Sequence, residues 1–270
     1  SAAQADLRRK LHQTMGKVAD DQLGQIFAHD MNAAGIHFST PPLKGGAETA
    51  RCLIAVTPDA QRSMSTYLGA CVEFSEADVD ETIIRDSEMI YLEGYLFDKD
   101  TAKDAYMKAT HLAHKNNVRV ALTLSDSFCV ERHRTAFQSL IRHNVDILFA
   151  NEAEILALYQ SARFEDAIGE ASRYCNTLVV TRGAQGSVLV TDNGIIPVPA
   201  HPVEKLVDTT GAGDQYAAGF LFGLAQGLPY YQCGALGSLA AAEVIGHVGP
   251  RPETSLAALA EKELGIKSAA

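Results

Sequence analysis

The sequence predicts an α/β fold in which helices cover both faces of a mostly parallel central sheet, with a small β lid. From about residue 88 onward, short apolar runs rich in β-branched residues alternate with longer segments of helical period. These runs are apolar almost throughout, as expected for strands that are covered on both faces. The expected strands are 89–96, 119–124, 145–150 and 177–181, and the expected helices are 101–116, 131–143 and two pieces within 152–175.

Two further stretches are typical of antiparallel hairpins. Residues 51–57 and 63–68 flank a turn that begins Pro58-Asp59, and they form part of a lid that we expect within about 36–72. Residues 187–190 and 195–198 flank 191–194, where Asn193-Gly194 supplies the positive φ of a tight turn. This second hairpin is expected at the edge of the main sheet. Helices are expected after it, over 211–226, 230–245 and 253–264.

The amino-terminal part departs from this pattern. A charged helix is expected over 5–15, and it leads directly into 16–21, whereas an α/β fold usually opens with a strand that carries site residues. We therefore expect that an opening segment is missing before residue 16. The chain of 270 residues is otherwise expected to form a single domain.

Charge and composition point to a small-molecule partner. The chain carries 23 Lys and Arg against 33 Asp and Glu, which gives a formal charge of −10 and argues against binding to nucleic acid or an anionic membrane. No apolar run approaches the roughly 20 residues that span a bilayer, and the first residues lack a signal-peptide core, so a cytoplasmic protein is expected. The cysteines are scattered without a C-x-x-C pair and are expected to be reduced packing residues: Cys52, Cys71, Cys129, Cys175 and Cys233.

The strongest local signal is the segment 207–220. Glycines lead directly into a helix there, so Gly211, Ala212 and Gly213 would present unpaired backbone amides that bind a phosphate. Asp214 lies in the same first turn, where the helix dipole stabilises its carboxylate beside that phosphate as a base for an alcohol. The alternative is a glycine turn followed by an acid that only favours the helix start. Neither the dinucleotide fingerprint nor the P-loop pattern occurs.

Asp208-Thr-Thr-Gly-Ala-Gly-Asp214 followed by an Ala- and Gly-rich helix resembles the carboxy-terminal signature of the PfkB carbohydrate kinases, the ribokinase-like family. Other segments match in the family's order over about 16–264: 16–24, 56–59, 151–154 and 181–187. Residues 66–71, 93–95 and 124–128 look most like the bacterial adenosine-kinase-like branch. The family's Gly-Gly-x-x-x-Asn motif and the opening strand with a substrate-gripping Asp are absent, which supports the expectation of a missing segment.

The resemblance implies ATP and Mg²⁺ as cofactors. Asn151 and Glu154 fit a capping box at a helix start, and the family's N-x-x-E motif implies in addition that Glu154 organises hydrated magnesium while Asn151 contacts phosphate or water. The two roles are compatible. The remaining cofactor-binding positions are matched by resemblance, against the simpler alternatives of a glycine turn or helix packing: Thr181, Gly183 and Gly186 beside the ATP phosphates and ribose, and Ser238, Ala241 and Ala242 around the adenine.

By the same resemblance, carbonyls near Asp208 and Thr210, with the turn 249–252, would hold a monovalent cation such as K⁺. Tyr95 and Asp126 are the substrate contacts that we would test first. The aromatics Tyr67, Tyr95, Phe97 and Phe128 either stack on a substrate or belong to the core. The nine histidines show no supporting carboxylate pattern, and no metal is assigned to them.

The expected function is therefore ATP-dependent phosphorylation of a hydroxyl of a nucleoside, with adenosine favoured, or of a sugar. The alternative is a sugar kinase of the ribokinase, fructokinase or ketodeoxygluconate kinase type, because the same phosphate machinery serves both. A non-catalytic nucleotide-binding regulator on this fold, and a nicotinamide-dependent oxidoreductase, are the rivals from other classes. The exposed face of the lid is a surface through which two copies could pair as a homodimer.

Overall fold

The structure, a computed structural model, describes residues 13–267 and divides the chain into two compact units. Unit 1 comprises the chain up to residue 53 together with 65–148, and unit 2 comprises 54–64 and everything from 149 onward. The predicted helix over 5–15 lies mostly outside the described residues, and its last part is strand β1 (Gln13–Thr14). None of the described helices combines the length and the apolarity that crossing a bilayer would need.

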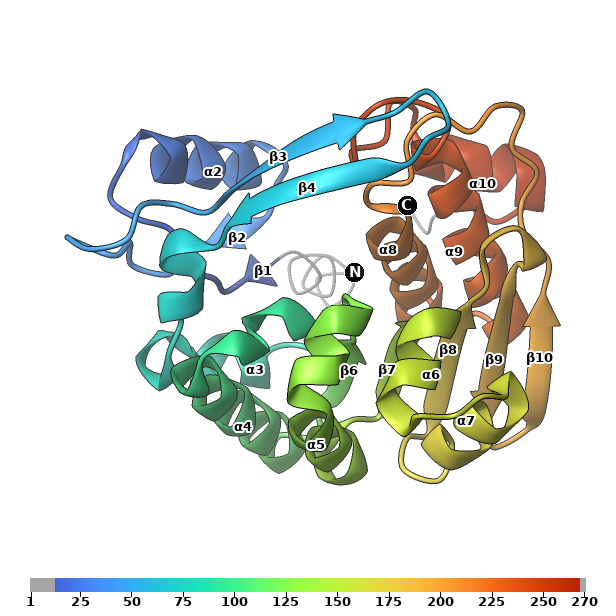
Figure 1. The fold of residues 1–270 in the computed structure, drawn as a ribbon, viewed down its shortest axis with the longest axis horizontal. Coiled ribbons are helices and arrows are strands. Elements are labelled where there is room, and N and C mark those ends of the chain that lie inside the picture. Colours follow the sequence, from blue (N-terminus) through green and yellow to red (C-terminus); the bar gives the residue numbers. More distant parts are fainter. Residues whose placement is uncertain (1–12, 268–270) are drawn as a thin grey trace, which may run out of the picture. The chain divides into compact units, whose positions relative to one another are not determined.

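Unit 1 is built around the parallel pair β5 (Met89–Glu93) and β6 (Arg119–Thr123), in which Tyr91 lies opposite Ala121. The long helices α4 and α5 follow these strands in the chain (Figure 1). The predicted strand 89–96 is too long, because the chain turns at Gly94 into a short 3-10 helix. The other elements are α2 (Gln22–Ala33), β2 (His37–Phe38), α3 (Glu81–Arg85), α4 (Asp100–Lys115), α5 (Ser127–Asn144), and the 3-10 helices η1 (Gly69–Glu73), η2 (Glu76–Asp78) and η3 (Gly94–Asp98).

The core of unit 1 is aromatic and aliphatic. Phe97 stacks on Phe137 with ring centroids 4.3 Å apart, and Leu122 and Leu124 are fully buried. The phenolic hydroxyl of Tyr106 donates a hydrogen bond of 2.5 Å to the carbonyl of Glu93. This bond ties α4 to the carboxyl end of β5, where the predicted substrate residues begin.

Unit 2 contains the antiparallel strands β8 (Thr177–Thr181), β9 (Ser187–Thr191) and β10 (Gly194–Val198). The main sheet follows the order β10-β9-β8-β7-β6-β5, with β7 at Ile147–Asn151, which confirms that the second hairpin lies at the edge. The positive φ in its turn falls on Gly194 and not on Asn193. The helices of this unit are α6 (Glu152–Tyr159), α7 (Phe164–Ala171), α8 (Ala212–Ala225), α9 (Tyr230–Val244) and α10 (Leu256–Leu264), with the 3-10 helix η4 (Gly183–Gln185).

Small residues let α8 and α9 pack closely. A Cβ added at Gly219 would lie 2.6 Å from the carbonyl oxygen of Leu236, and one added at Gly237 would lie 2.6 Å from that of Tyr216. The Ala- and Gly-rich composition of both helices therefore has a packing role, and Figure 1 shows α8 and α9 side by side.

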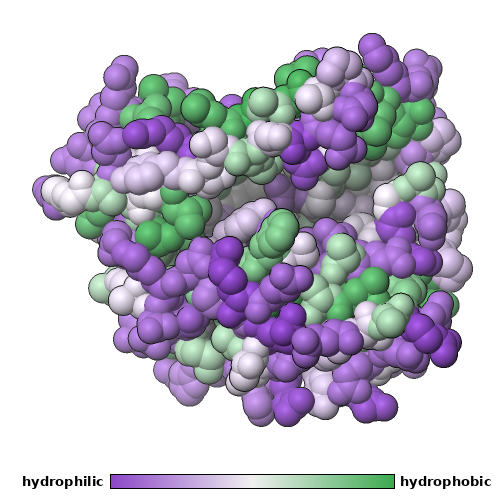
Figure 2. Space-filling model, viewed as in Figure 1, coloured by the Kyte–Doolittle hydropathy of each residue, from purple (hydrophilic) through white to green (hydrophobic). Residues whose placement is uncertain are grey.

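The predicted first hairpin is present as β3 (Arg51–Val56) and β4 (Arg62–Tyr67). Its apolar side chains Leu53, Ile54 and Met64 are exposed. Helix α2 also exposes apolar residues, at positions 23, 26 and 27, and Figure 2 shows hydrophobic surface at the upper left, where α2 lies in Figure 1. Cys129, Cys175 and Cys233 are buried as predicted for packing residues, whereas Cys52 on β3 is exposed, contrary to that prediction.

Candidate active site

The start of α8 has the geometry of an anion-binding turn. Gly211 adopts φ +79° at the N-cap position, which favours glycine, and no side chain caps the helix. Within the described part of the chain, the amides of Gly211, Gly213 and Asp214 donate no hydrogen bond. The amide of Ala212, predicted to be a further donor, makes a long bond of 3.3 Å to the carbonyl of Thr209 instead. A Cβ at Gly213 would meet open space, so no neighbouring group covers the turn at that residue.

Asp214 lies in this first turn, and its side chain is exposed to solvent. The protein atoms around the carboxyl group still desolvate it in part and raise its pKa, while the positive charge of Arg62 acts in the opposite direction. A carboxylate that is accessible and whose pKa is raised is suited to accept a proton from an alcohol.

Asp208 stabilises the anion-binding turn through hydrogen bonds to its backbone and to a neighbouring loop. Its side chain is only 2% exposed, and its Oδ1 accepts hydrogen bonds from the amide and the hydroxyl of Thr210, at 2.9 and 2.7 Å. Its Oδ2 accepts a bond of 3.0 Å from the amide of Gly249. Burial raises the pKa of Asp208, but these hydrogen bonds outweigh it and hold the pKa below its ordinary value. Asp208 therefore stays ionised and joins residues 208–210 to the loop after α9.

Arg62 is a functional candidate that the sequence analysis missed. It begins β4, and its guanidinium donates a hydrogen bond to the hydroxyl of Thr209, beside the anion-binding turn. Its positive charge favours the ionised form of both Asp208 and Asp214: it contributes to the lowered pKa of Asp208 and partly opposes the rise in the pKa of Asp214. The hairpin itself was predicted, but nothing in the sequence distinguishes Arg62 from the other exposed arginines.

Asn151 and Glu154 form the predicted capping box at the start of α6. The side chain of Asn151 accepts from the amide of Glu154 at 2.9 Å, and Glu154 accepts from the amide of Asn151 at 2.8 Å and from its side-chain nitrogen at 2.7 Å. Glu154 is 5% exposed. The capping role is therefore confirmed. A metal bound directly to Glu154 would have to displace these bonds, whereas a hydrated ion can be held through water with them in place.

The turn after β8 brings a second predicted motif next to the first. Thr181 ends β8, and Gly183 and Gly186 have φ of +56° and +84°. A Cβ at Gly186 would lie 2.1 Å from the carbonyl oxygen of Val198, so this position requires glycine. Arg182, which lies between Thr181 and Gly183, pairs with Glu152 through two hydrogen bonds of 3.0 Å and lies over the ring of Phe164. The ion pair holds the turn against the start of α6.

Ser238, Ala241 and Ala242 all lie on α9. Ser238 is buried, accepts a bond of 2.7 Å from the amide of His201 and donates one of 3.2 Å to the carbonyl of Pro199. These bonds show a structural role for Ser238, since they fix the segment after β10 on α9. Ala241 and Ala242 are half-buried on the following turn.

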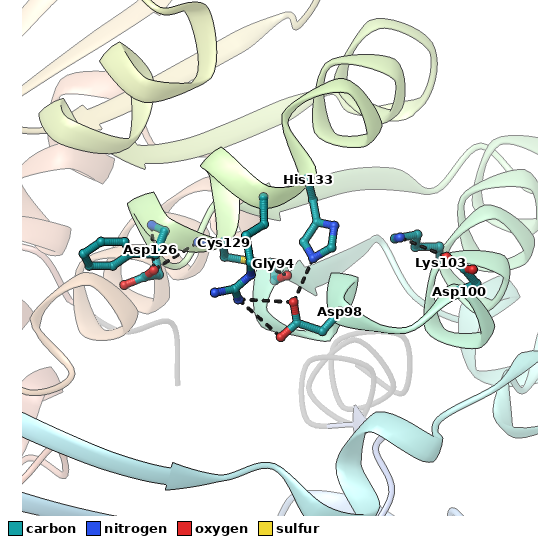
Figure 3. Close-up of polar contacts among 9 residues, drawn as sticks. Gly94, Asp98, Asp100, Lys103, Asp126, Cys129 and His133 are labelled. Carbon is teal, nitrogen blue, oxygen red and sulfur yellow. Dashed lines mark hydrogen bonds and ion pairs between the residues drawn. The ribbon is translucent and has the colours of Figure 1, made fainter.

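The two predicted substrate residues lie in unit 1. Tyr95 is in η3 and is 47% exposed. Asp126 caps α5, and one of its carboxylate oxygens, Oδ1, accepts bonds from the amides of Phe128 and Cys129 at 2.8 and 3.1 Å (Figure 3). The preceding residue, Ser125, has φ +67° and donates to Glu93. These bonds hold the Asp126 carboxylate at the carboxyl end of β6.

Beside them, Asp98 at the end of η3 accepts a bond of 2.7 Å from His133 Nε2 and bonds of 3.2 and 3.3 Å from Arg132, as Figure 3 shows for Asp98 and His133. Burial raises the pKa of Asp98, but the bond from His133 and the charge of Arg132 hold it below its ordinary value. The aromatics divide clearly, since Phe97 belongs to the core whereas Tyr67, Tyr95 and Phe128 are exposed.

Unpaired amides at the start of a helix, with an exposed carboxylate in its first turn, can bind a phosphate and accept a proton beside it, as in a phosphotransferase. The sequence matches the pfkB family of carbohydrate kinases over residues 10–256. The chain therefore belongs to the pfkB family and is an ATP-dependent kinase with an alcohol group as acceptor, in a family that uses ATP and Mg²⁺.

The relatives that this chain resembles include both adenosine kinases and sugar kinases. The solved adenosine kinase of Sinorhizobium meliloti is 49% identical, with a TM-score of 0.90 over 96% of this chain and 80% of that one. A probable sugar kinase of Rhizobium etli is 44% identical, with a TM-score of 0.92 over 97% and 81%. The adenosine kinase of Saccharomyces cerevisiae is 26% identical over 87% of this chain and 72% of its own, and a 5-dehydro-2-deoxygluconokinase of Bacillus thuringiensis is 25% identical over 86% and 73%.

Proposed function

We propose that this kinase transfers the γ-phosphoryl group of ATP to the primary hydroxyl of a nucleoside, with adenosine as the first candidate. The observation that carries the proposal is the solvent-exposed carboxylate of Asp214 beside the unpaired amides of Gly211 and Gly213. The similarity to the Sinorhizobium meliloti adenosine kinase supports a nucleoside acceptor. The similarity to the Rhizobium etli probable sugar kinase supports the alternative, a sugar acceptor.

In the proposed reaction the protein positions groups and balances charge, because the transition state of phosphoryl transfer is loose. The amides at the start of α8 bind the terminal phosphate, and Asp214 takes the proton of the acceptor hydroxyl. The guanidinium of Arg62 lies beside this turn and stabilises the negative charge of the transferring group. The β3–β4 hairpin acts as a lid that excludes water and limits hydrolysis of ATP.

An ADP-release assay across adenosine, other nucleosides, ribose, fructose and ketodeoxy sugars tests the proposal. We expect the highest kcat/KM with adenosine. A higher value with a sugar would establish the alternative, and ATP binding without acceptor-dependent ADP release would indicate a nucleotide-binding regulator.

Tyr95 and Asp126 are proposed to contact the acceptor. Asn is as good an N-cap as Asp, so Asp126→Asn keeps the cap of α5 but removes the charge that would accept a substrate hydroxyl. We expect Asp126→Asn to raise the KM for the acceptor about tenfold or more, the cost of one hydrogen bond to a charged group. Tyr95→Ala should also raise it. The KM for ATP should stay unchanged in both variants, and a normal acceptor KM would contradict the assignment.

Glu154 is proposed to organise magnesium through water. When bound, Mg²⁺ neutralises charge between the phosphates. Gln is accepted at this capping-box position, so Glu154→Gln can keep the bond from the amide of Asn151, while it removes the negative charge and the oxygen that accepts from the Asn151 side chain. We expect the Mg²⁺ concentration for half-maximal rate to rise. A magnesium titration identical to that of the wild type would leave Glu154 with the capping role alone.

The remaining expectations stay predictions. The bonds from Val207 to Ile245 and from Gly249 to Asp208 bring two stretches of backbone together near Asp208 and Thr210, which supports a K⁺ site there. Rate measurements with K⁺ replaced by a large organic cation test it.

The exposed Leu53, Ile54 and Met64 of the hairpin support a homodimer, which sedimentation tests. The single domain and a cytoplasmic location are likewise predicted from sequence alone.

A further inference from the structure

The loop between α9 and α10 forms one wall of the anion-binding turn. The amide of Gly249 donates to Asp208, and the side-chain nitrogen of Gln215 donates to the carbonyl of Pro250 at 3.3 Å. Pro250 also lies against Gly211, since a Cβ added there would come within 2.6 Å of the Pro250 Cβ. The position of this loop therefore sets where the start of α8 can lie.

Both ends of the loop are held by one side chain, that of Glu243. Its Oε1 accepts hydrogen bonds from the amides of Glu253 and Thr254, each 2.9 Å long, and one of 3.0 Å from the Thr254 hydroxyl. Its Oε2 is 3.4 Å from Nε2 of His247 at the beginning of the loop. The side chain of Glu243 is 7% exposed. One carboxylate thus closes the loop from residue 247 to residue 254.

The place of Glu243 in α9 is unfavourable in isolation. It occupies the last turn of the helix, where the helix dipole disfavours a negative charge, and it is removed from water. Burial raises its pKa, but the bonds from Thr254, His247 and Glu253 outweigh burial and keep the pKa below its ordinary value. These bonds offset the cost of the charge, and each of them goes to the loop that carries Gly249 and Pro250.

We propose that Glu243 is a positioning residue for phosphoryl transfer. It does not contact the reacting groups. By closing the loop it holds Pro250 against Gly211 and Gly249 against Asp208, and so keeps the amides of the anion-binding turn directed at the phosphate. This inference rests on the proposed function of that turn.

The test compares Glu243→Ala with Glu243→Gln. Gln keeps the oxygen that can accept the three bonds from Glu253 and Thr254, whereas Ala removes all of them. We expect Glu243→Ala to lower kcat by about 10- to 100-fold, as displacement of a binding group by about 1 Å does, with the acceptor KM little changed. Glu243→Gln should restore most of kcat. Glu261→Ala, an exposed carboxylate on α10, is the matched control and should leave kcat unchanged.

Hydrogen exchange of the backbone amides separates this inference from the proposed function. In Glu243→Ala, we expect faster exchange in 247–254 and also in 209–215, whether or not the acceptor has been identified. Faster exchange in the loop alone, or a normal kcat with only a lower melting temperature, would reduce Glu243 to a structural role and overturn the inference. A wild-type protein without acceptor-dependent ADP release would instead contradict the proposed function.

If Glu243→Ala does not fold, Thr254→Val serves as a second variant, because it removes only the bond from the Thr254 hydroxyl to Glu243. We expect the same two effects, more weakly. Normal kcat and normal exchange in that variant would overturn the inference.

Discussion

Replacing Asp214 by Asn should lower kcat about 10²- to 10⁴-fold, the usual contribution of a general base. The amide has the same shape as the carboxylate but cannot accept the proton of the acceptor hydroxyl. ATP binding should persist, because the amides of Gly211 and Gly213 are unchanged. Steady-state ADP release and calorimetric titration with ATP measure the two quantities. A near-normal turnover would refute the assignment of the base.

The pH dependence of the wild type gives an independent check on Asp214. Only the ionised carboxylate can act as a base, and its pKa is raised by partial desolvation. The rate should therefore fall as the pH drops through a pKa above the ordinary value of an aspartate. The acid limb of kcat in Asp214→Asn should be lost, because no group titrates at that position.

Replacing Arg62 by Gln should have the second largest effect. The cation lies beside the anion-binding turn, and removing one preorganised charge or donor of this kind lowers kcat by about 10²- to 10³-fold. Desolvation raises the pKa of Asp214, and the positive charge of Arg62 partly opposes that rise. Its loss should therefore raise that pKa and move the acid limb of the rate profile to higher pH. Rate profiles of the two proteins against pH measure both effects.

Two further variants sharpen this test. Arg62→Lys keeps the positive charge, so the acid limb should stay closer to that of the wild type even where kcat falls. Arg51→Gln is the matched control, since Arg51 lies on the same hairpin but pairs with Glu48 and the ring of Tyr67. Equal losses in the Arg51 and Arg62 variants would assign the effect to the hairpin as a whole and not to the cation.

Much of the fold could be predicted from the sequence because local patterns agree with the tertiary structure. The strand at 177–181 has the predicted bounds, and α8 and α9 each match to within one residue at either end. Helix α2 was not predicted, although Asp21 caps it through the amide of Gly24. Its exposed apolar residues leave no simple contrast between a buried and a polar face.

The site was predictable where one continuous segment builds it. The anion-binding turn and the capping box each lie within a few residues, so their backbone geometry follows from local sequence. Arg62 bonds to Thr209, 147 residues further along the chain, and a single sequence does not show which distant residues meet. Glu243 bonds to Thr254 only 11 residues further on, but no sequence motif marks a carboxylate that closes an irregular loop. The engagement of the Ala212 amide depends on the exact turn at Thr209, which motif spacing does not specify.

The ion pair between Arg182 and Glu152 has a consequence for how this protein can vary. Each residue is the immediate neighbour of a position predicted to bind the nucleotide, and the pair joins the turn after β8 to the start of α6. Substitution of either partner alone removes both hydrogen bonds and leaves the other charge to water, since the side chains are 25% and 35% exposed, so we expect the two positions to change together among homologues. An exchange of both for a complementary apolar pair would preserve the spacing that neither single change can.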